Sequence, residues 1–267
     1  MPDKKITLTT LRNMKQAGEK FACLTAYDAT FARLLDDAGV EVVLVGDSLG
    51  MVVQGQESTL PVTMDEMIYH THNVSRGCSH SLVLADMSFM SYATPDQAMF
   101  NAGRLMAEGH AHAVKLEGGA VMVETVKQLT AHGIPVCAHL GLLPQSVNKL
   151  GGYRVQGKEA EAANTILQDS IAMQEAGADL LLFECIPSSL AAEITSKVDI
   201  PVIGIGAGAD CDAQVLVLHD MLGITPGKRP KFSKNFMEEA DSIQQAINNY
   251  VKEVKAGTFP GLEHSFS

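Results

Sequence analysis

Cysteine is scarce in this chain, and its arrangement argues against a protein stabilised by disulfides. The 267 residues contain five cysteines, an odd number, and no CxxC pair. A disulfide framework needs paired cysteines, and these are typical of oxidising compartments. Cys137 and Cys185 lie inside apolar runs, where cysteine usually acts as a small hydrophobic side chain. We therefore expect a reducing, cytoplasmic compartment.

Long hydrophobic segments and linkers are also missing. No apolar run approaches the roughly 18 residues that a membrane span needs. The first ten residues, MPDKKITLTT, lack the apolar segment of a secretory signal. No stretch rich in proline, glycine and serine divides the chain. We expect no membrane association and a single domain over residues 1–267.

Positive charge is in deficit. Lysine and arginine number 20 against 31 aspartates and glutamates, which gives a net charge of −11. This balance argues against a protein that follows nucleic-acid phosphates. A small anionic substrate stays possible, because the local charge of a site decides such binding. The hydrophobic content of 46% is that of an ordinary globular protein with a large core.

Short apolar runs recur along the chain and alternate with stretches of helical spacing. Most of these runs are continuously apolar, as in parallel strands buried on both faces. About eight alternations predict a parallel α/β fold, and eight repeats favour a closed (β/α)8 TIM barrel over an open sheet. The predicted strands are FACLTA (21–26), VVLVG (42–46), LVLAD (82–86), AVKLE (113–117), IPVCAHL (134–140), DLLLFE (179–184), PVIGIGAG (201–208) and QVLVLHD (214–220).

Capping signals mark several of the predicted helices. Thr63 and Glu66 have the spacing of a capping box, and Thr94 precedes a proline at the first helical position. Helices are also predicted over 119–132 and 159–176, with an extra N-terminal helix over 9–18 and a C-terminal one over 235–255. The irregular segment 140–157 follows the fifth predicted strand. On a barrel such a long segment is typical of an active-site lid.

Four of the apolar runs end in a carboxylate. Asp47 and Ser48 follow VLVG (43–46) directly, and later runs finish at Asp86, Glu117 and Glu184. In a (β/α)8 barrel the carboxyl ends of all strands meet in one mouth, where the chemistry takes place. We therefore expect these acids around a single cavity.

A lysine and a histidine are expected to join them. Lys115 precedes Glu117 by two residues on one predicted strand, so both side chains point to the same face. His139 lies near the end of the next strand. Lys115 can meet a substrate carboxylate or a developing enolate oxygen.

Acids placed close together repel one another unless a cation or a proton intervenes. Mg²⁺ prefers oxygen ligands and is usually held by one or two carboxylates with water and substrate oxygens. Asp47 and Asp86 are the candidate ligands, and Glu117 is either a ligand or an acceptor for metal-bound water. Ser48 offers a hydroxyl and a backbone N–H. Glu184 is left as the candidate general base.

Each of these residues also has a structural interpretation. Asp47 and Asp86 can cap the helices that follow them. Lys115 can be an ion-pair partner of Glu117, and His139 can be a packed core residue. Glu184 can be an acid on the outer rim. The motif GIGAG (204–208) can bind a phosphate through backbone N–H groups or serve tight packing.

The chain resembles the ketopantoate hydroxymethyltransferase family over nearly its whole length. One departure is Ala213, where we expect glycine. The matching stretches are LTAYDATFARLLDDAG (24–39), VGDSLGMVVQG (45–55), TLPVT (59–63), KLEGG (115–119), GIPVCAHLGLLPQSVNKLGGYRVQG (133–157), FECIP (183–187) and IGIGAGADCDAQVLVLHDMLG (203–223).

The resemblance implies a Mg²⁺-dependent barrel enzyme of pantothenate biosynthesis. It implies hydroxymethyl transfer from 5,10-methylenetetrahydrofolate to 3-methyl-2-oxobutanoate through a Mg-bound enolate, giving 2-dehydropantoate. It also implies a homo-oligomer, a decamer. Residue by residue, the matches are Asp47, Asp86 and Glu117 with the metal site, Ser48, Lys115 and His139 with the substrate site, and Glu184 with the proposed base.

Two other functions fit a barrel with this set of acids. A lyase or mutase of the isocitrate lyase and phosphoenolpyruvate mutase type also needs an enolate on Mg²⁺, but the KKCGH loop common in those enzymes does not occur in this chain. A non-catalytic barrel would bind a keto acid without turnover, and the retained carboxylates argue against it.

Overall fold

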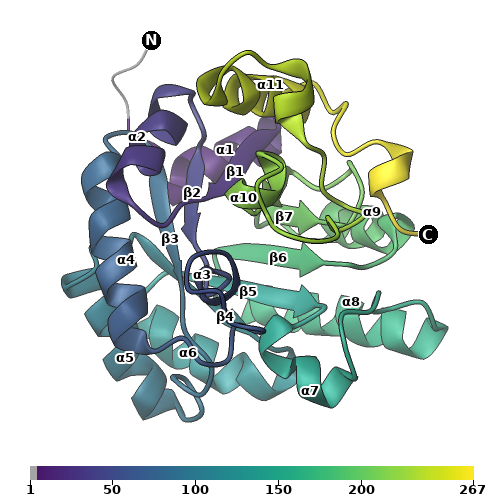
Figure 1. The fold of residues 1–267 in the computed structure, drawn as a ribbon. Helices are drawn as coiled ribbons and strands as arrows, with labels where there is room; N and C mark the ends of the chain where they lie inside the picture. Colours follow the sequence, from purple (N-terminus) through teal and green to yellow (C-terminus); the bar gives the residue numbers. More distant parts are fainter. Residues whose placement is uncertain (1–4) are drawn as a thin grey trace.

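Eight short strands, buried along nearly all of their length, form the centre of the molecule. The computed structural model describes residues 5–267, in which parallel pairing joins the strands in sequence order and joins β8 back to β1 (Figure 1). This confirms the predicted (β/α)8 barrel. The strands are β1 Phe21–Thr25, β2 Val42–Val45, β3 Leu82–Asp86, β4 Ala113–Glu117, β5 Val136–Gly141, β6 Leu180–Glu184, β7 Val202–Ile205 and β8 Ala213–Leu216.

The last two strands are shorter than their apolar runs predicted. β7 ends at Ile205 because Gly206 turns the chain with a φ of 61°. β8 ends at Leu216, and a short helix, α10 (Leu218–Met221), follows it. The backbone N–H of Leu218 donates a hydrogen bond to the Thr25 hydroxyl at 2.9 Å, so the chain leaves the barrel wall there. Continuous apolarity does not mark these ends, because the following residues are buried as well.

The helices lie outside the barrel and begin largely where the capping signals place them. Thr63 and Glu66 form a reciprocal capping box, and the Thr94 side chain accepts a hydrogen bond from the Gln97 N–H. The helices are α1 Leu8–Ala17, α2 Ala29–Asp37, α3 Leu49–Val52, α4 Met64–Gly77, α5 Pro95–Ala107, α6 Val123–Ala131, α7 Val147–Leu150, α8 Ala160–Glu175, α9 Ser188–Lys197 and α11 Ile243–Lys255, with 3₁₀ turns η1 Ala120–Met122, η2 Pro144–Ser146, η3 Phe236–Glu239 and η4 Leu262–His264.

The predicted C-terminal helix over 235–255 is two elements rather than one. Ala240 is extended and ends η3, and the Ser242 side chain then caps α11 by accepting a hydrogen bond from the Gln245 N–H. The separate α11 packs against β1. Its Tyr250 is fully buried, with a hydroxyl 2.9 Å from the Cys23 carbonyl oxygen and 2.8 Å from that of Gln214. This helix therefore fixes the seam where β8 meets β1.

The cysteines behave as the sequence predicted. All five are free, and four of them, Cys78 excepted, are buried. None of the helices among residues 5–267 has a stretch both long and apolar enough to cross a membrane.

Replacing Tyr250 with phenylalanine should destabilise the barrel. The change removes one buried hydroxyl and the hydrogen that it shares between the carbonyl oxygens of Cys23 and Gln214, a loss of about 1–3 kcal/mol. Urea unfolding followed by circular dichroism measures it. Tyr69→Phe is the matched control, because Tyr69 is 65% exposed and its substitution should change stability by less than about 0.5 kcal/mol. Equal effects of the two substitutions would contradict this account of the seam.

Candidate active site

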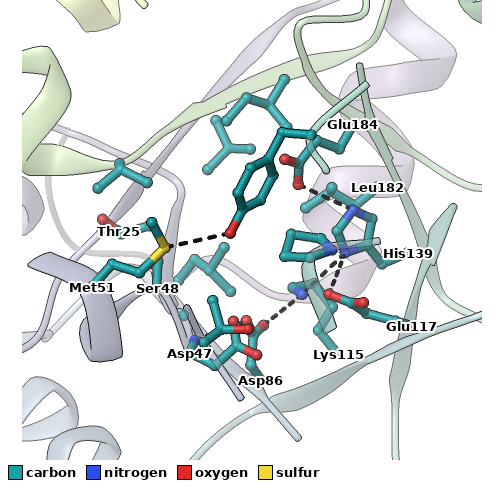
Figure 2. A pocket seen from close by; sticks show the side chains of 18 of the residues that line it. Thr25, Asp47, Ser48, Met51, Asp86, Lys115, Glu117, His139, Leu182 and Glu184 are labelled. Atoms are coloured by element: carbon teal, nitrogen blue, oxygen red, sulfur yellow. Dashed lines mark hydrogen bonds and ion pairs between the residues drawn. The ribbon is translucent and has the colours of Figure 1, made fainter. Parts of the chain in front are cut away.

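A cavity of about 150 Å³ opens at the carboxyl ends of the strands. Every site residue expected from the sequence lines it, as Figure 2 shows. These residues are Asp47, Ser48, Asp86, Lys115, Glu117, His139 and Glu184. The structure thus brings together groups that lie up to 137 residues apart (184 − 47) in the sequence.

Strand register sets which of these groups are neighbours. Asp86 on β3 lies beside Lys115 on β4, and Glu117 on β4 lies beside His139 on β5. Glu184 ends β6, one strand further along. Because residues i and i+2 of a strand share a face, Lys115 and Glu117 both point into the cavity. The functional side chains therefore follow one arc of the barrel rim.

Asp47 and Asp86 form a buried pair of acids. Their exposed fractions are 4% and 3%, and the backbone N–H of Asp47 donates a hydrogen bond to Asp86 Oδ2 at 3.0 Å. Neither residue caps a helix, since Thr63 caps α4, Thr94 caps α5, and α3 begins after Ser48 without a side-chain cap. The capping interpretation is therefore wrong for both aspartates.

Lys115 pairs with Asp86 rather than with Glu117. Its Nζ lies 2.9 Å from Asp86 Oδ1, and both side chains are almost fully buried. Burial alone lowers the pKa of an ammonium, but the charges of Asp86, Glu117 and Asp47 outweigh it and raise the pKa of Lys115 well above its usual value. The cavity therefore contains a permanent positive charge.

His139 lies beside Lys115, with 3.3 Å between its Nδ1 and the Lys115 ammonium, and it also contacts two acids. Its Nδ1 lies 3.5 Å from Glu117 Oε1, and its Nε2 lies 3.4 Å from Glu184 Oε2 (Figure 2). Burial and the charge of Lys115 lower the pKa of His139, but Glu117 and Glu184 raise it more, so the net shift is upward. The imidazole is buried, as the core interpretation required, but it also lines the cavity and lies next to Glu184.

Glu184 and Ser48 lie on opposite sides of the opening. The Glu184 side chain is 15% exposed and belongs to the cavity wall rather than to an outer rim. The Ser48 hydroxyl lies 2.9 Å from the hydroxyl of Tyr27 and makes no helix cap. Both side chains are accessible to a ligand in the cavity.

Several residues of the site were not singled out individually from the sequence. Pro144 and Tyr153 reach the cavity from the segment that was predicted to be a lid, and the Tyr153 hydroxyl lies 3.8 Å from Met51 Sδ. Gln145, in the same segment, donates a hydrogen bond to Asp47 at 2.8 Å. Phe232 comes from a distant C-terminal segment. The segment therefore lies over the site, and its movement as a lid remains a prediction.

The GIGAG motif serves close packing. A Cβ atom on Gly208 would lie 2.5 Å from the Ser188 Cβ, and one on Gly204 would lie 2.8 Å from the Cys211 Sγ. Gly206 and Gly208 also have positive φ angles, 61° and 82°. Glycine is needed here for these reasons alone, so the packing interpretation accounts for the motif.

The acid pair has the chemistry of a divalent-cation site. Burial, and then the charge of Asp86, raise the pKa of Asp47 to about 8. Among residues 5–267 no group of three or more histidine, cysteine or acidic side chains has the geometry of a complete metal site. Two carboxylates with water and substrate oxygens are nevertheless the usual set for Mg²⁺. Asp47 and Asp86 fit that set.

The raised pKa of Asp47 predicts a pH-dependent stability in the absence of cations. Between about pH 4 and pH 8 the unfolded state has lost this proton and the native state keeps it, so stability falls as pH rises, by at most about 1.4 kcal/mol per unit. Asp47→Asn, which stays neutral, should flatten this dependence. Urea unfolding in EDTA at pH 5 and pH 8 measures the difference. The exposed Asp210→Asn is the control, and identical slopes for all three proteins would refute the prediction.

The sequence of this chain matches one protein family over nearly its whole length. Residues 5–262 match the family model described as ketopantoate hydroxymethyltransferase. A 3-methyl-2-oxobutanoate hydroxymethyltransferase of Nitrosococcus oceani is 62% identical over 98% of this chain and 99% of its own. A protein of Hahella chejuensis, 3-methyl-2-oxobutanoate hydroxymethyltransferase 2, is 58% identical over the same shares.

The fold itself is shared more widely. A phosphoenolpyruvate phosphomutase from Streptomyces platensis subsp. rosaceus superimposes with a TM-score of 0.62 at 16% identity, covering 81% of this chain and 82% of its own. This likeness concerns the barrel alone. The sequence match, rather than the barrel, therefore separates the hydroxymethyltransferase from the lyase and mutase alternatives.

Proposed function

This chain belongs to the ketopantoate hydroxymethyltransferase family, and from this membership we propose that it transfers a hydroxymethyl group from 5,10-methylenetetrahydrofolate to 3-methyl-2-oxobutanoate. The product is 2-dehydropantoate, on the route to pantothenate and coenzyme A. The observation that supports the proposal is that one cavity is lined by the buried acids Asp47 and Asp86, by Lys115, and by the more exposed carboxylate of Glu184.

The keto acid needs positive charge at its carboxylate and at its 2-oxo group. Asp47 and Asp86 would hold Mg²⁺, which when bound supplies Lewis-acid polarisation of the carbonyl. Lys115 is a fixed ammonium beside that pair, placed to stabilise negative charge as it develops on a substrate oxygen. The Ser48 hydroxyl offers a hydrogen bond to the substrate carboxylate. Glu117 would accept a hydrogen bond from a metal-bound water.

Proton removal falls to Glu184. Its carboxylate lines the cavity 3.4 Å from His139 Nε2, and the other ring nitrogen of His139 lies 3.3 Å from the Lys115 ammonium. Glu184 takes the proton from C3 of the keto acid, which leaves an enolate. The nucleophilic C3 then forms a bond to the methylene carbon of the folate donor as one of its two C–N bonds breaks. Water supplies the hydroxyl group as the second C–N bond breaks, and tetrahydrofolate leaves with one proton from C3, passed on by Glu184, and one from water. Pro144 and Tyr153 line the cavity as well.

The setting of the enzyme is part of the same proposal. We place it in the cytoplasm, where the five free cysteines stay reduced. The resemblance supports a homo-oligomer, with a decamer as the expected assembly, and neither nucleic acid nor membrane as a partner.

Proton NMR of 3-methyl-2-oxobutanoate in D₂O tests the function. With Mg²⁺ the C3–H signal should disappear, and hydroxymethyl resonances should appear only when the folate donor is added. A chelator should abolish both changes. Exchange without transfer would refute the folate donor and keep the enolising site. Absence of both would refute the transferase and favour a lyase or a binding protein.

Glu184→Gln should separate binding from proton removal. The amide keeps the shape of the side chain but is not a base, so C3–H exchange should fall at least about a hundredfold. Keto-acid affinity, measured by calorimetry, should change little. Glu193→Gln is the matched control, because the Glu193 side chain is 50% exposed on α9. Exchange at the native rate in Glu184→Gln would remove this residue as the base.

A further inference from the structure

Gln145 is buried behind the cavity wall in the segment that joins β5 to α8. It lies in the 3₁₀ turn η2, and 5% of it is exposed. It does not line the cavity, whereas its chain neighbour Pro144 does. A ligand in the cavity would therefore touch the residues around Gln145 and not Gln145 itself.

The side-chain amide is fully engaged. Nε2 donates to Asp47 Oδ2 at 2.8 Å and to the Met87 carbonyl oxygen at 2.9 Å, and Oε1 accepts from the Tyr92 hydroxyl. A flipped amide would place its oxygen against the Asp47 carboxylate and the Met87 carbonyl, which are both acceptors. The orientation is therefore fixed by its partners.

The same residue also reaches the acid on the other side of the site. The backbone N–H of Gln145 donates to Glu117 Oε2 at 3.1 Å. The Tyr92 hydroxyl accepts a hydrogen bond from the Glu117 N–H at 3.3 Å. Gln145 and Tyr92 thus form a closed network that joins Asp47, after β2, to Glu117, at the end of β4.

The chemical type of this donor matters. A lysine or arginine in the place of Gln145 would neutralise Asp47 and remove the reason for a cation to bind. A neutral amide orients the carboxylate and leaves its negative charge available. Hydrogen bonds of this kind to ligating carboxylates fix their direction and tune metal affinity.

We propose that Gln145 is a positioning residue, which holds Asp47 and Glu117 in one arrangement and so makes a divalent-cation site of high affinity. The inference rests on the proposed function, in which Asp47 binds the cation. It further assigns the segment 142–159 a role in the site, because this segment contains Gln145, which donates hydrogen bonds to Asp47 and Glu117 without lining the cavity itself.

Manganese binding tests the proposal without any assay of activity. Free Mn²⁺ is measured by electron paramagnetic resonance as the full-length protein is titrated. Gln145→Met keeps the side-chain volume and removes the three hydrogen bonds of the amide, so Kd should rise about tenfold to a hundredfold at unchanged stoichiometry. Gln156→Met is the matched control. Gln156 belongs to the same segment, and its side-chain amide donates to the Arg154 carbonyl oxygen, away from the site, so the Kd of this variant should equal that of the native protein.

A second variant tests the same proposal if Gln145→Met does not fold. Tyr92→Phe removes a single hydroxyl from the network and should raise Kd severalfold, a smaller effect because the bond from Gln145 to Asp47 is kept. A merely structural role would lower the number of sites and leave Kd unchanged, and that result would overturn the proposal. Native Kd in Gln145→Met, or in Tyr92→Phe if the former does not fold, would also overturn it. Failure of the native protein to bind Mn²⁺ would instead refute the cation site of the proposed function, and this inference with it.

Discussion

The hydrogen-bonded register of the parallel strands is the constraint on which the rest of the molecule depends. Backbone pairing sets Asp86 beside Lys115 and Glu117 beside His139. The register thereby determines which acid lies next to the ammonium group of Lys115 and which lies next to the imidazole of His139. Side chains alone do not fix this choice, since Lys115 and Glu117 share one strand and point to one face. The site is thus a consequence of barrel closure, and the α11 helix that secures the β8–β1 seam contributes to it from the opposite end of the chain.

Charge is distributed unevenly around the cavity. As a result, one side can attract a cation and the other can accept a proton. Four carboxylates face one ammonium and one imidazole. Asp86 has Lys115 as its partner, while the Asp47 side chain accepts a hydrogen bond from the neutral Gln145 amide and has a raised pKa. This side attracts cations. Across the cavity, Glu184 contacts His139 and remains partly open to solvent, so it keeps the freedom to accept a proton. One site therefore combines a cation-attracting side with a basic side, and His139 lies between them, 3.3 Å from the Lys115 ammonium and 3.4 Å from Glu184.

Local signals in the sequence predicted much of this arrangement. Continuous apolar runs gave the strands, Thr63 and Thr94 gave helix starts, and acids at strand ends gave the members of the site. The signals failed where distant residues decide the outcome. The Thr25 hydroxyl helps to end β8 across the seam, and Lys115 selects Asp86 because of strand register. Gln145 lies within the matching stretch 133–157, but nothing in its periodicity or spacing distinguishes it from a surface glutamine. Its role depends on how a long segment folds back over β2 and β4.

The alternation along β4 has a consequence for how such an enzyme can evolve. Lys115 and Glu117 face the cavity, while Leu116 between them is buried toward the surrounding helices. Insertion of one residue before Lys115 within this strand would exchange the two faces, turning the lysine under a helix and a leucine into the site. Insertion or deletion of a single residue within such a strand is therefore not tolerated, because it turns the functional side chains out of the cavity. The segments between strands are not bound in this way, so insertions and deletions that natural selection can retain must fall there.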